Sequence, residues 1–213
     1  AGRTKRTKIP PGTIREGGFG GVEGLKKFIK DESIDVLIDA THPFAKTISN
    51  HATIAARDLG RPHLILRRPN WVMPKIAQII NFNQMTEVAN YPAIQGKRVF
   101  LSSGTQGLQS LAKLKNVWFL VRLITKPDES LPLPNHKVII DSPPFIEEQE
   151  IALLEEHKID LMVSKHSGGG LPAKITAATK LKIPIILIHQ PPPPVGRKTT
   201  CIEEALVWLK ARL

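Results

Sequence analysis

Three stretches of the chain follow the same order: a short apolar run that favours a strand, a loop rich in small or polar residues, and a helical pattern. The apolar runs cover residues 34–39, 98–101 and 159–163. Strands that alternate with helical stretches are typical of β–α–β units, in which successive strands are parallel. The pattern therefore predicts an α/β fold class built on parallel sheets.

Two of these stretches also resemble each other. In each, an Ile-Asp pair begins the first strand, an Ala-Lys pair opens the helix, and a second strand follows, at residues 63–66 and at residues 185–188. The repeat indicates two similar α/β halves, although β–α–β order is common enough to arise by convergence. We expect a nucleotide-binding-like domain at residues 1–94 and a second Rossmann-like domain at residues 95–213.

The chain carries a formal net charge of +11 over its 213 residues. A solvated basic surface, nucleic acid or a small anionic ligand could each account for this charge. Aromatic residues make up only 5% of the chain, and we find no familiar nucleic-acid module, which argues against nucleic acid. No apolar run reaches the roughly 18 residues that span a bilayer. Cys201 is the single cysteine, which excludes an internal disulfide and favours a reducing cytoplasm.

In open parallel sheets, ligands bind at the carboxyl ends of strands, beside helix N-termini whose backbone N–H groups favour anions. The loop at residues 39–44 is expected at such a position. His42 titrates near neutrality and could move a proton or bind an anion, and Phe44 offers a flat apolar face. The alternative is that His42 is an ordinary polar residue before a helix that starts at Pro43.

A glycine-rich segment at residues 16–24 surrounds Phe19 with four glycines. Glycine lets a backbone approach a ligand closely and supplies positive φ angles. The spacing does not match the dinucleotide fingerprint, and no strand is readable before it, so a flexible turn is an equal alternative.

Two further loops, at residues 102–107 and 165–170, each follow an expected strand. The second combines Lys165, Ser167 and three glycines ahead of a helix with Lys174, which suits a carboxylate or a phosphate. Arg122 ends the apolar run after the first of these loops. Plain strand–turn–helix connections are the alternative for both. Neither a Walker loop nor a serine hydrolase elbow is present.

Three motifs taken together resemble the precorrin-6A reductase family. They are Gly-Gly-Phe-Gly-Gly at residues 17–21, Asp-Ala-Thr-His-Pro-Phe at residues 39–44, and Lys-His-Ser-Gly-Gly at residues 165–169. The resemblance implies two Rossmann-like domains with the active site in the cleft between them. It also implies hydride transfer from a reduced nicotinamide to a double bond of precorrin-6A, or of its cobalt-containing counterpart, in cobalamin biosynthesis. That tetrapyrrole carries many carboxylates, which gives the positive charge a purpose.

The chain departs from the family pattern in three places. The strand–helix–strand with a Gly-Gly-Thr loop that opens family members is expected to be missing, so that the first domain is truncated at its start. His166 stands where the family more often has Asn, and His189-Gln190-Pro191 stands in place of an Arg-Pro. For the cofactor, Arg3 and its basic neighbours favour NADPH over NADH, because a basic residue there accommodates a 2′-phosphate.

We thus expect three sets of site residues and no metal site, and we leave the oligomeric state open. The catalytic set, which would supply or relay a proton, is Asp39, His42 and Lys165. The cofactor-binding set is Gly2, Arg3, Gly18, Phe19, Gly20, Gly21, Thr41, Pro43 and Phe44. The substrate-binding set is Arg68, Ser103, Gly104, Arg122, Ser167, Gly168, Gly169 and Lys174.

Overall fold

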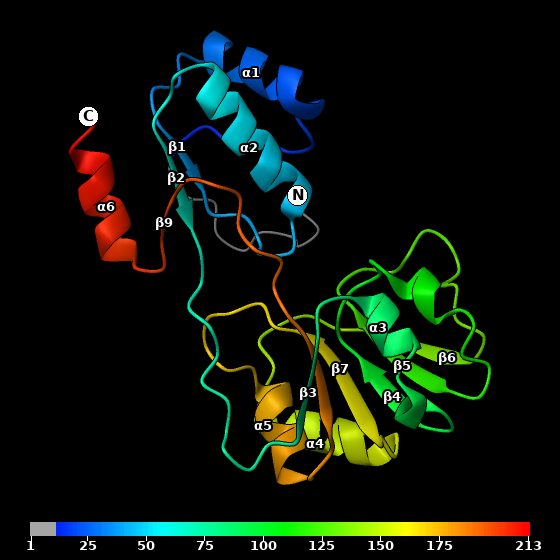
Figure 1. Ribbon diagram of the computed structural model, residues 1–213. Coiled ribbons are helices and arrows are strands. Elements are labelled where there is room, and N and C mark those ends of the chain that lie inside the picture. Colours follow the sequence, from blue (N-terminus) through cyan, green and yellow to red (C-terminus); the bar gives the residue numbers. More distant parts are fainter. Residues whose placement is uncertain (1–11) are drawn as a thin grey trace. The chain divides into compact units, whose positions relative to one another are not determined.

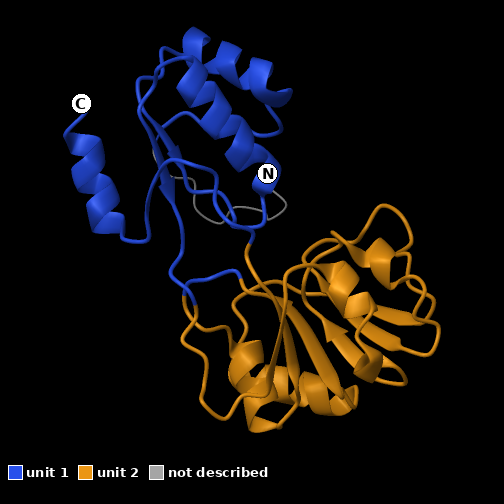
Figure 2. Ribbon diagram, viewed as in Figure 1, with its two compact units in different colours: residues 1–70, 167–169, 191–213 blue, residues 71–166, 170–190 orange. Residues whose placement is uncertain are grey.

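The computed structural model describes residues 12–213, and the chain forms two compact units, each with its own parallel sheet (Figure 1, Figure 2). The first unit contains the residues up to Asn70 together with Ser167–Gly169 and Pro191–Leu213. The second contains Trp71–His166 and Gly170–Gln190. The predicted α/β fold class with parallel sheets is confirmed.

The sheet of the first unit has the order β1-β2-β9, and both strand pairs are parallel. Its elements are α1 (Gly21–Asp31), β1 (Leu37–Asp39), α2 (Lys46–Asp58), β2 (His63–Leu66), β9 (Arg197–Thr199) and α6 (Ile202–Lys210). Trp208 and Ala205 of α6 pack against Leu64, which is buried in the central strand β2. This packing holds the last helix of the chain on the sheet.

Helices α1 and α2 share an apolar interface. Leu25 and Ile29 of α1 pack with Ala52 and Ala55 of α2, and the small alanines let the two helices approach closely. Spacing of three or four residues places each pair on one helix face, which explains why these positions are apolar.

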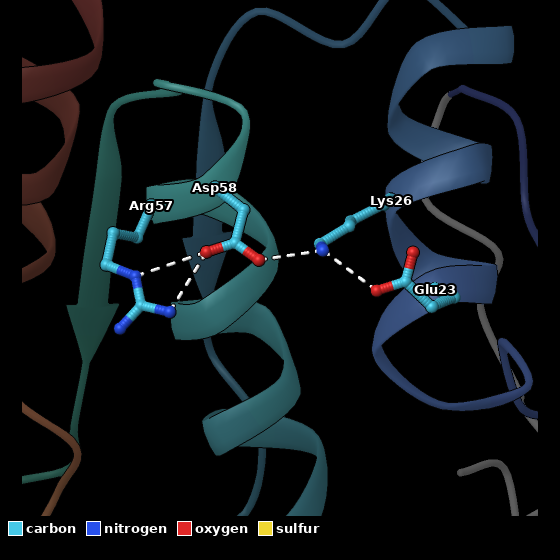
Figure 3. A network of polar contacts seen from close by, with 4 residues as sticks. All are labelled: Glu23, Lys26, Arg57 and Asp58. Atoms are coloured by element: carbon cyan, nitrogen blue, oxygen red, sulfur yellow. Dashed lines mark hydrogen bonds and ion pairs between the residues drawn. The ribbon is translucent and has the colours of Figure 1, made fainter.

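A polar network also joins the two helices at their surface (Figure 3). The Lys26 ammonium lies 2.8 Å from the Glu23 carboxylate of its own helix and 2.7 Å from the Asp58 carboxylate of α2. Arg57 also donates to Asp58. These groups are accessible to solvent, so the apolar interface contributes more to the stability of the pair.

The second unit contains a sheet of six parallel strands in the order β3-β8-β7-β4-β5-β6. Its strands are β3 (Ile79–Phe82), β4 (Arg98–Leu101), β5 (Trp118–Leu123), β6 (His136–Ile140), β7 (Leu161–Lys165) and β8 (Ile185–Ile188). Its helices are α3 (Met85–Ala89), η1 (Pro92–Ile94), η2 (Leu108–Leu111), α4 (Glu147–Glu156) and α5 (Ala173–Lys180). The central strands read as continuous apolar runs because they are buried on both faces.

The order of this sheet fixes where a ligand would bind. From β4 the chain continues outward to β5 and β6, and then returns to place β7 on the other side of β4. The carboxyl ends of β4 and β7 therefore flank a topological switch point, where connections leave in opposite directions and a crevice opens. The loops that begin at Ser102 and His166 start at this point.

The internal repeat seen in the sequence is a structural repeat. One copy is β1–α2–β2, in which Leu37 is paired with His63 and Asp39 with Ile65. The other is β7–α5–β8, in which the two strands are again parallel neighbours. Each copy places its first loop at the carboxyl end of its sheet.

The structure differs from the sequence expectations in one loop and in the division of the chain. The helix expected after the loop at residues 102–107 and through Leu114 is only the short 3-10 helix η2, whose N-cap Gly107 has a left-handed conformation (φ 87°). The two compact units also do not coincide with residues 1–94 and 95–213. Strand β3, from the first expected domain, pairs with β8 in the second unit. Strand β9, from the second expected domain, pairs with β2 in the first unit.

No helix within residues 12–213 is long and apolar enough to cross a membrane.

Candidate functional site

Asp39 lies at the carboxyl end of β1, at the start of the first candidate loop. Its carboxylate accepts hydrogen bonds from the hydroxyl (2.6 Å) and the backbone N–H (3.0 Å) of Thr41. The Thr41 hydroxyl is also 3.0 Å from that of Ser49 on α2. These contacts fix the loop to the first turn of the helix.

The Asp39 carboxylate is buried but charged. Burial alone would raise its pKa, but hydrogen bonds from Ser49 and Thr41 outweigh burial and hold the pKa below its usual value. Asp39 in turn opposes the effect of burial on Arg67, whose pKa burial lowers. Asp39 is thus suited to orient groups and to balance a cation, and not to donate a proton at neutral pH.

His42, Pro43 and Phe44 complete this loop. The imidazole of His42 is exposed, and its Nδ1 accepts a hydrogen bond from the backbone N–H of Phe44 (3.3 Å). The two rings lie 5.9 Å apart. Pro43 is buried and Phe44 is half-buried, so His42 is the most exposed of these three side chains.

The glycines that follow Lys165 pack against the segment after β2. Gly169 donates its N–H to the carbonyl of Pro69 (2.8 Å). A Cβ on Gly168 would lie 2.7 Å from the same carbonyl and 3.0 Å from the Cβ of Arg68, and Gly168 has a φ of +71°. Position 168 therefore requires glycine. In the first unit, the structure thus places Ser167–Gly169 beside Arg68, one residue after the Arg67 that interacts with Asp39.

The glycine-rich segment forms the start of α1, a helix that the sequence did not reveal. Gly20 is the N-cap and Gly21 the first helical residue, both with positive φ, and no side chain within the described residues caps the helix. Phe19 packs against Phe28 of the helix, and the two ring centroids are 5.2 Å apart. Gly18 is exposed, and a Cβ at this position would have no atom of residues 12–213 within 4 Å beyond its chain neighbours. Gly2 and Arg3 lie outside the described residues.

In the second unit, the predicted residues gather at the carboxyl edge of the six-stranded sheet. The Lys165 ammonium is 3.4 Å from the side-chain oxygen of Gln106. Ser103 follows β4 and is only 6% exposed, and its hydroxyl has no hydrogen-bond partner within residues 12–213. Gly104 beside it has a φ of +73°.

Arg122 and Lys174 form a cationic cluster at the same edge. The Arg122 guanidinium donates two hydrogen bonds to the Glu150 carboxylate and lies over the rings of Phe145 and Phe100, at 3.9 Å and 5.0 Å. Lys174 donates to the hydroxyl of Ser102, over 2.9 Å. Arg122 is therefore committed to Glu150, which leaves Lys174 as the cation of this cluster suited to a ligand.

Three rings stack beside these loops. Trp71 lies on His166 with centroids 4.6 Å apart, and His166 lies on His189 with centroids 6.0 Å apart. His189 Nε2 is 2.9 Å from the side-chain oxygen of Asn81. The two histidines that depart from the family pattern are thus direct neighbours, which the sequence could not show.

The geometry adds four residues to the predicted set. Ser49, Arg67, Ser102 and Glu150 each contact a predicted residue or interact with its charge. Only Ser102 carried a sequence signal, because it directly follows an expected strand. The other three act through tertiary contacts.

A hollow of about 390 Å³ lies in the second unit, lined by residues such as Ile79, Leu161 and Pro184. These residues are at the amino ends of β3, β7 and β8, the opposite edge from the loops described above. Its position makes it a poor candidate for the site. Among the described residues, no cluster of three or more His, Cys, Asp or Glu side chains could hold a metal ion.

Comparison with known proteins adds an independent result. The model of the family "Precorrin-6x reductase CbiJ/CobK" matches residues 1–210. Precorrin-6A reductase of Mycobacterium tuberculosis (strain ATCC 25618 / H37Rv) is 41% identical over 212 residues, which are 98% of this chain and 85% of that protein. Precorrin-6A reductase of Rhodococcus erythropolis is 38% identical over 211 residues, with the same two coverages.

A cobalt-precorrin-6A reductase from Methanothermobacter thermautotrophicus is more distant, at 31% identity over 177 residues, which are 79% of this chain and 59% of that protein. A solved structure of CobK precorrin-6A reductase aligns with a TM-score of 0.90 and 32% sequence identity. The alignment covers 99% of this chain and 84% of that one.

Proposed function

Because the chain belongs to the precorrin-6x reductase CbiJ/CobK family, we propose that it reduces a double bond of precorrin-6A, or of its cobalt-containing counterpart, with NADPH as hydride donor. The observation that carries the proposal is the match over almost the whole chain to reductases of this name, in both sequence and fold. The substrate class is then an anionic tetrapyrrole of cobalamin biosynthesis.

The first unit has features that suit a dinucleotide. No side chain of residues 12–213 caps the N-terminus of α1, which makes its first backbone N–H groups candidates for binding a phosphate. A Cβ at Gly18 or Gly20 would meet no atom of the described residues within 4 Å beyond the chain neighbours. We assign Gly18, Gly20 and Gly21 to the phosphates of the dinucleotide. Thr41 and His42, which follow the carboxyl end of β1, are assigned to the same cofactor site. Phe19 supports the helix from its own core.

When bound, the reduced nicotinamide supplies the hydride. Reduction of the ring also needs a proton, for which His42 and Lys165 are our candidates, because both side chains can carry a proton near neutral pH. The ionised Asp39 holds the His42 loop through Thr41 and offsets the charge of Arg67. Arg68, Ser167 and the glycines beside them offer polar groups to the substrate.

The direct test is oxidation of NADPH by the purified protein with and without precorrin-6A. We expect NADPH oxidation only when the precorrin is present, and a lower rate with NADH at the same concentration. The cobalt-containing substrate, assayed in parallel, decides between the two forms. If neither substrate supports NADPH oxidation by the folded protein, the proposed reaction is wrong for this chain.

A further inference from the structure

The carboxyl edge of the six-stranded sheet holds more positive charge than its own carboxylates balance. Arg122 and Glu150 are 8% and 2% exposed and form a bidentate pair, so their charges cancel. Lys174 adds a third charge close enough to interact with both. No carboxylate of the described residues forms an ion pair with Lys174. The cluster therefore has a net charge of about +1 in a poorly solvated place.

Burial and the neighbouring charges change the pKa of Lys174. Burial lowers the pKa of Lys174 first and the nearby Arg122 lowers it further, while Glu150 opposes them, so that the pKa falls to about 8. The ammonium form still dominates at neutral pH. Lys174 is partly buried, and no carboxylate of residues 12–213 forms an ion pair with it. A desolvated cation without a counter-ion is costly, and an anion placed beside it would offset that cost.

Neutral hydrogen-bond donors accompany the lysine. Its ammonium donates to the Ser102 hydroxyl, and the next residue, Ser103, has a buried hydroxyl for which residues 12–213 provide no hydrogen-bond partner. Both serines follow β4 at the topological switch point, the position at which sheets of this order bind ligands. A buried hydroxyl without a partner is unusual, and an anionic oxygen that accepts from it would satisfy it.

We propose that Lys174, Ser102 and Ser103 form a subsite that binds one carboxylate of the substrate, with the Arg122–Glu150 pair holding the lysine in position. The proposal rests on the proposed function, because it takes the polyacid substrate from there. The subsite recognises a carboxylate through one ammonium and two hydroxyl donors. Arg122 is a positioning residue in this account and does not itself contact the ligand.

The subsite makes binding depend on pH in a defined direction. A bound carboxylate stabilises the protonated lysine and so raises its pKa. Above the pKa of the free lysine, binding must therefore be accompanied by proton uptake, and the affinity falls as the pH rises. Arginine at this position would keep its charge at every accessible pH and would abolish that loss.

The experiment measures binding of uroporphyrin, a stable planar macrocycle with many carboxylates, by quenching of porphyrin fluorescence. The variants are Lys174→Met, which removes the charge at similar volume, and Lys174→Arg, which keeps it. Lys180→Met is the matched control, because Lys180 lies on the same helix, is 65% exposed, and changes the net charge equally. Unfolding curves of all variants report whether they fold.

We expect Lys174→Met to weaken binding at neutral pH at least about tenfold relative to Lys180→Met. The wild type should lose affinity between about pH 7 and pH 9.5 and Lys174→Arg should not, beyond any drift common to both. Equal affinities of the two methionine variants, or equal pH profiles of the wild type and Lys174→Arg, would overturn the proposal. If Lys174→Met does not fold, the comparison of pH profiles decides.

Different experimental results would refute the proposed reaction and the proposed subsite. A wild type that oxidises NADPH with precorrin-6A, but whose porphyrin affinity does not depend on Lys174, refutes the subsite alone. A wild type that binds the porphyrin through Lys174 without reducing the precorrin refutes the reaction alone.

Discussion

Arg122 and Glu150, which lie 28 residues apart in the chain, meet in a bidentate pair inside the second unit. The pair joins β5 to α4, and the guanidinium also lies against the rings of Phe100 and Phe145. Because both charges are buried, each depends on the other: removal of one partner leaves a charge in a poorly solvated place.

Glu150→Ala should therefore destabilise the protein by about 3–5 kcal/mol. The double variant Arg122→Met/Glu150→Met should lose less, because it removes both charges and keeps apolar volume against the two phenylalanines. Urea unfolding measures both values. A single variant as stable as the double variant would contradict this account of the pair.

The sequence predicted the parts of the fold that depend on local pattern. Apolar runs followed by glycine or proline identify β1, β4, β7 and β8, since buried parallel strands are short and continuously apolar. Strand β9 was missed because Arg197–Thr199 has no apolar pattern and becomes a strand only by pairing with β2. The sequence also does not indicate that β9 belongs to the first unit.

The candidate site was predictable to the same extent. Asp39, Ser103 and Lys165 could be predicted as candidates because they lie at or just after the ends of expected strands. Parallel strands of a sheet present their carboxyl ends at one edge, where ligands bind. The contact of Lys174 with Ser102 spans 72 residues, and the stack of His166 on His189 depends on the pairing of β7 with β8. No pattern in the sequence carries such tertiary contacts.

Asp39 should make the stability of the protein depend on acid. Its folded-state pKa is below its usual value, so its stabilising contribution is complete above the unfolded-state pKa of about 3.9 and is lost as the pH falls through the folded-state value. The unfolding free energy of Asp39→Asn should fall less than that of the wild type below about pH 4. Asp35→Asn, an exposed carboxylate two residues before β1, serves as the control. Parallel pH profiles for wild type and Asp39→Asn would refute this role.

His42→Ala and Lys165→Ala should each lower kcat at least about tenfold while leaving the unfolding midpoint unchanged, because proton transfer by a positioned side chain contributes at least that much. Steady-state NADPH oxidation with precorrin-6A measures the rate. Lys137→Ala, an exposed lysine of β6, removes the same charge far from the carboxyl edge and should retain the wild-type rate. Wild-type rates for either test variant remove that residue from the site.

Gly24 of α1 has no room for a side chain. A Cβ at this position would lie 1.7 Å from the carbonyl oxygen of Phe19, so Gly24→Ala must displace the glycine-rich segment or the helix. We expect a loss of about 1–3 kcal/mol, the usual cost of forcing a methyl group into a filled space. Gly18→Ala is the matched control, because a Cβ at Gly18 would have no neighbour within 4 Å in the described part of the chain. Thermal unfolding compares the two, and equal midpoints would contradict the overlap.

Gly18→Ala also tests the cofactor assignment, because it should weaken NADPH binding without lowering stability if the dinucleotide approaches the backbone there. A fluorescence titration of the bound nicotinamide measures the affinity. Unchanged affinity would remove Gly18 from the cofactor site and leave the α1 N-terminus as the remaining candidate.

Trp71 should report the protonation of His166. Burial lowers the pKa of His166 below its usual value of 6.5; a backbone hydrogen bond opposes this effect, and the neighbouring His189 adds to it. A protonated imidazole quenches the emission of a tryptophan stacked on it, so the fluorescence of Trp71 should fall as the pH is lowered, with a midpoint below pH 6.5.

The measurement uses Trp118→Phe/Trp208→Phe, in which Trp71 is the remaining tryptophan of the chain. In that background, His166→Gln should abolish the transition, whereas His189→Gln should shift it to higher pH by removing the electrostatic interaction that lowers the pKa of His166. A midpoint above 6.5, or a transition that survives His166→Gln, would show that the stacked imidazole is not the group that titrates.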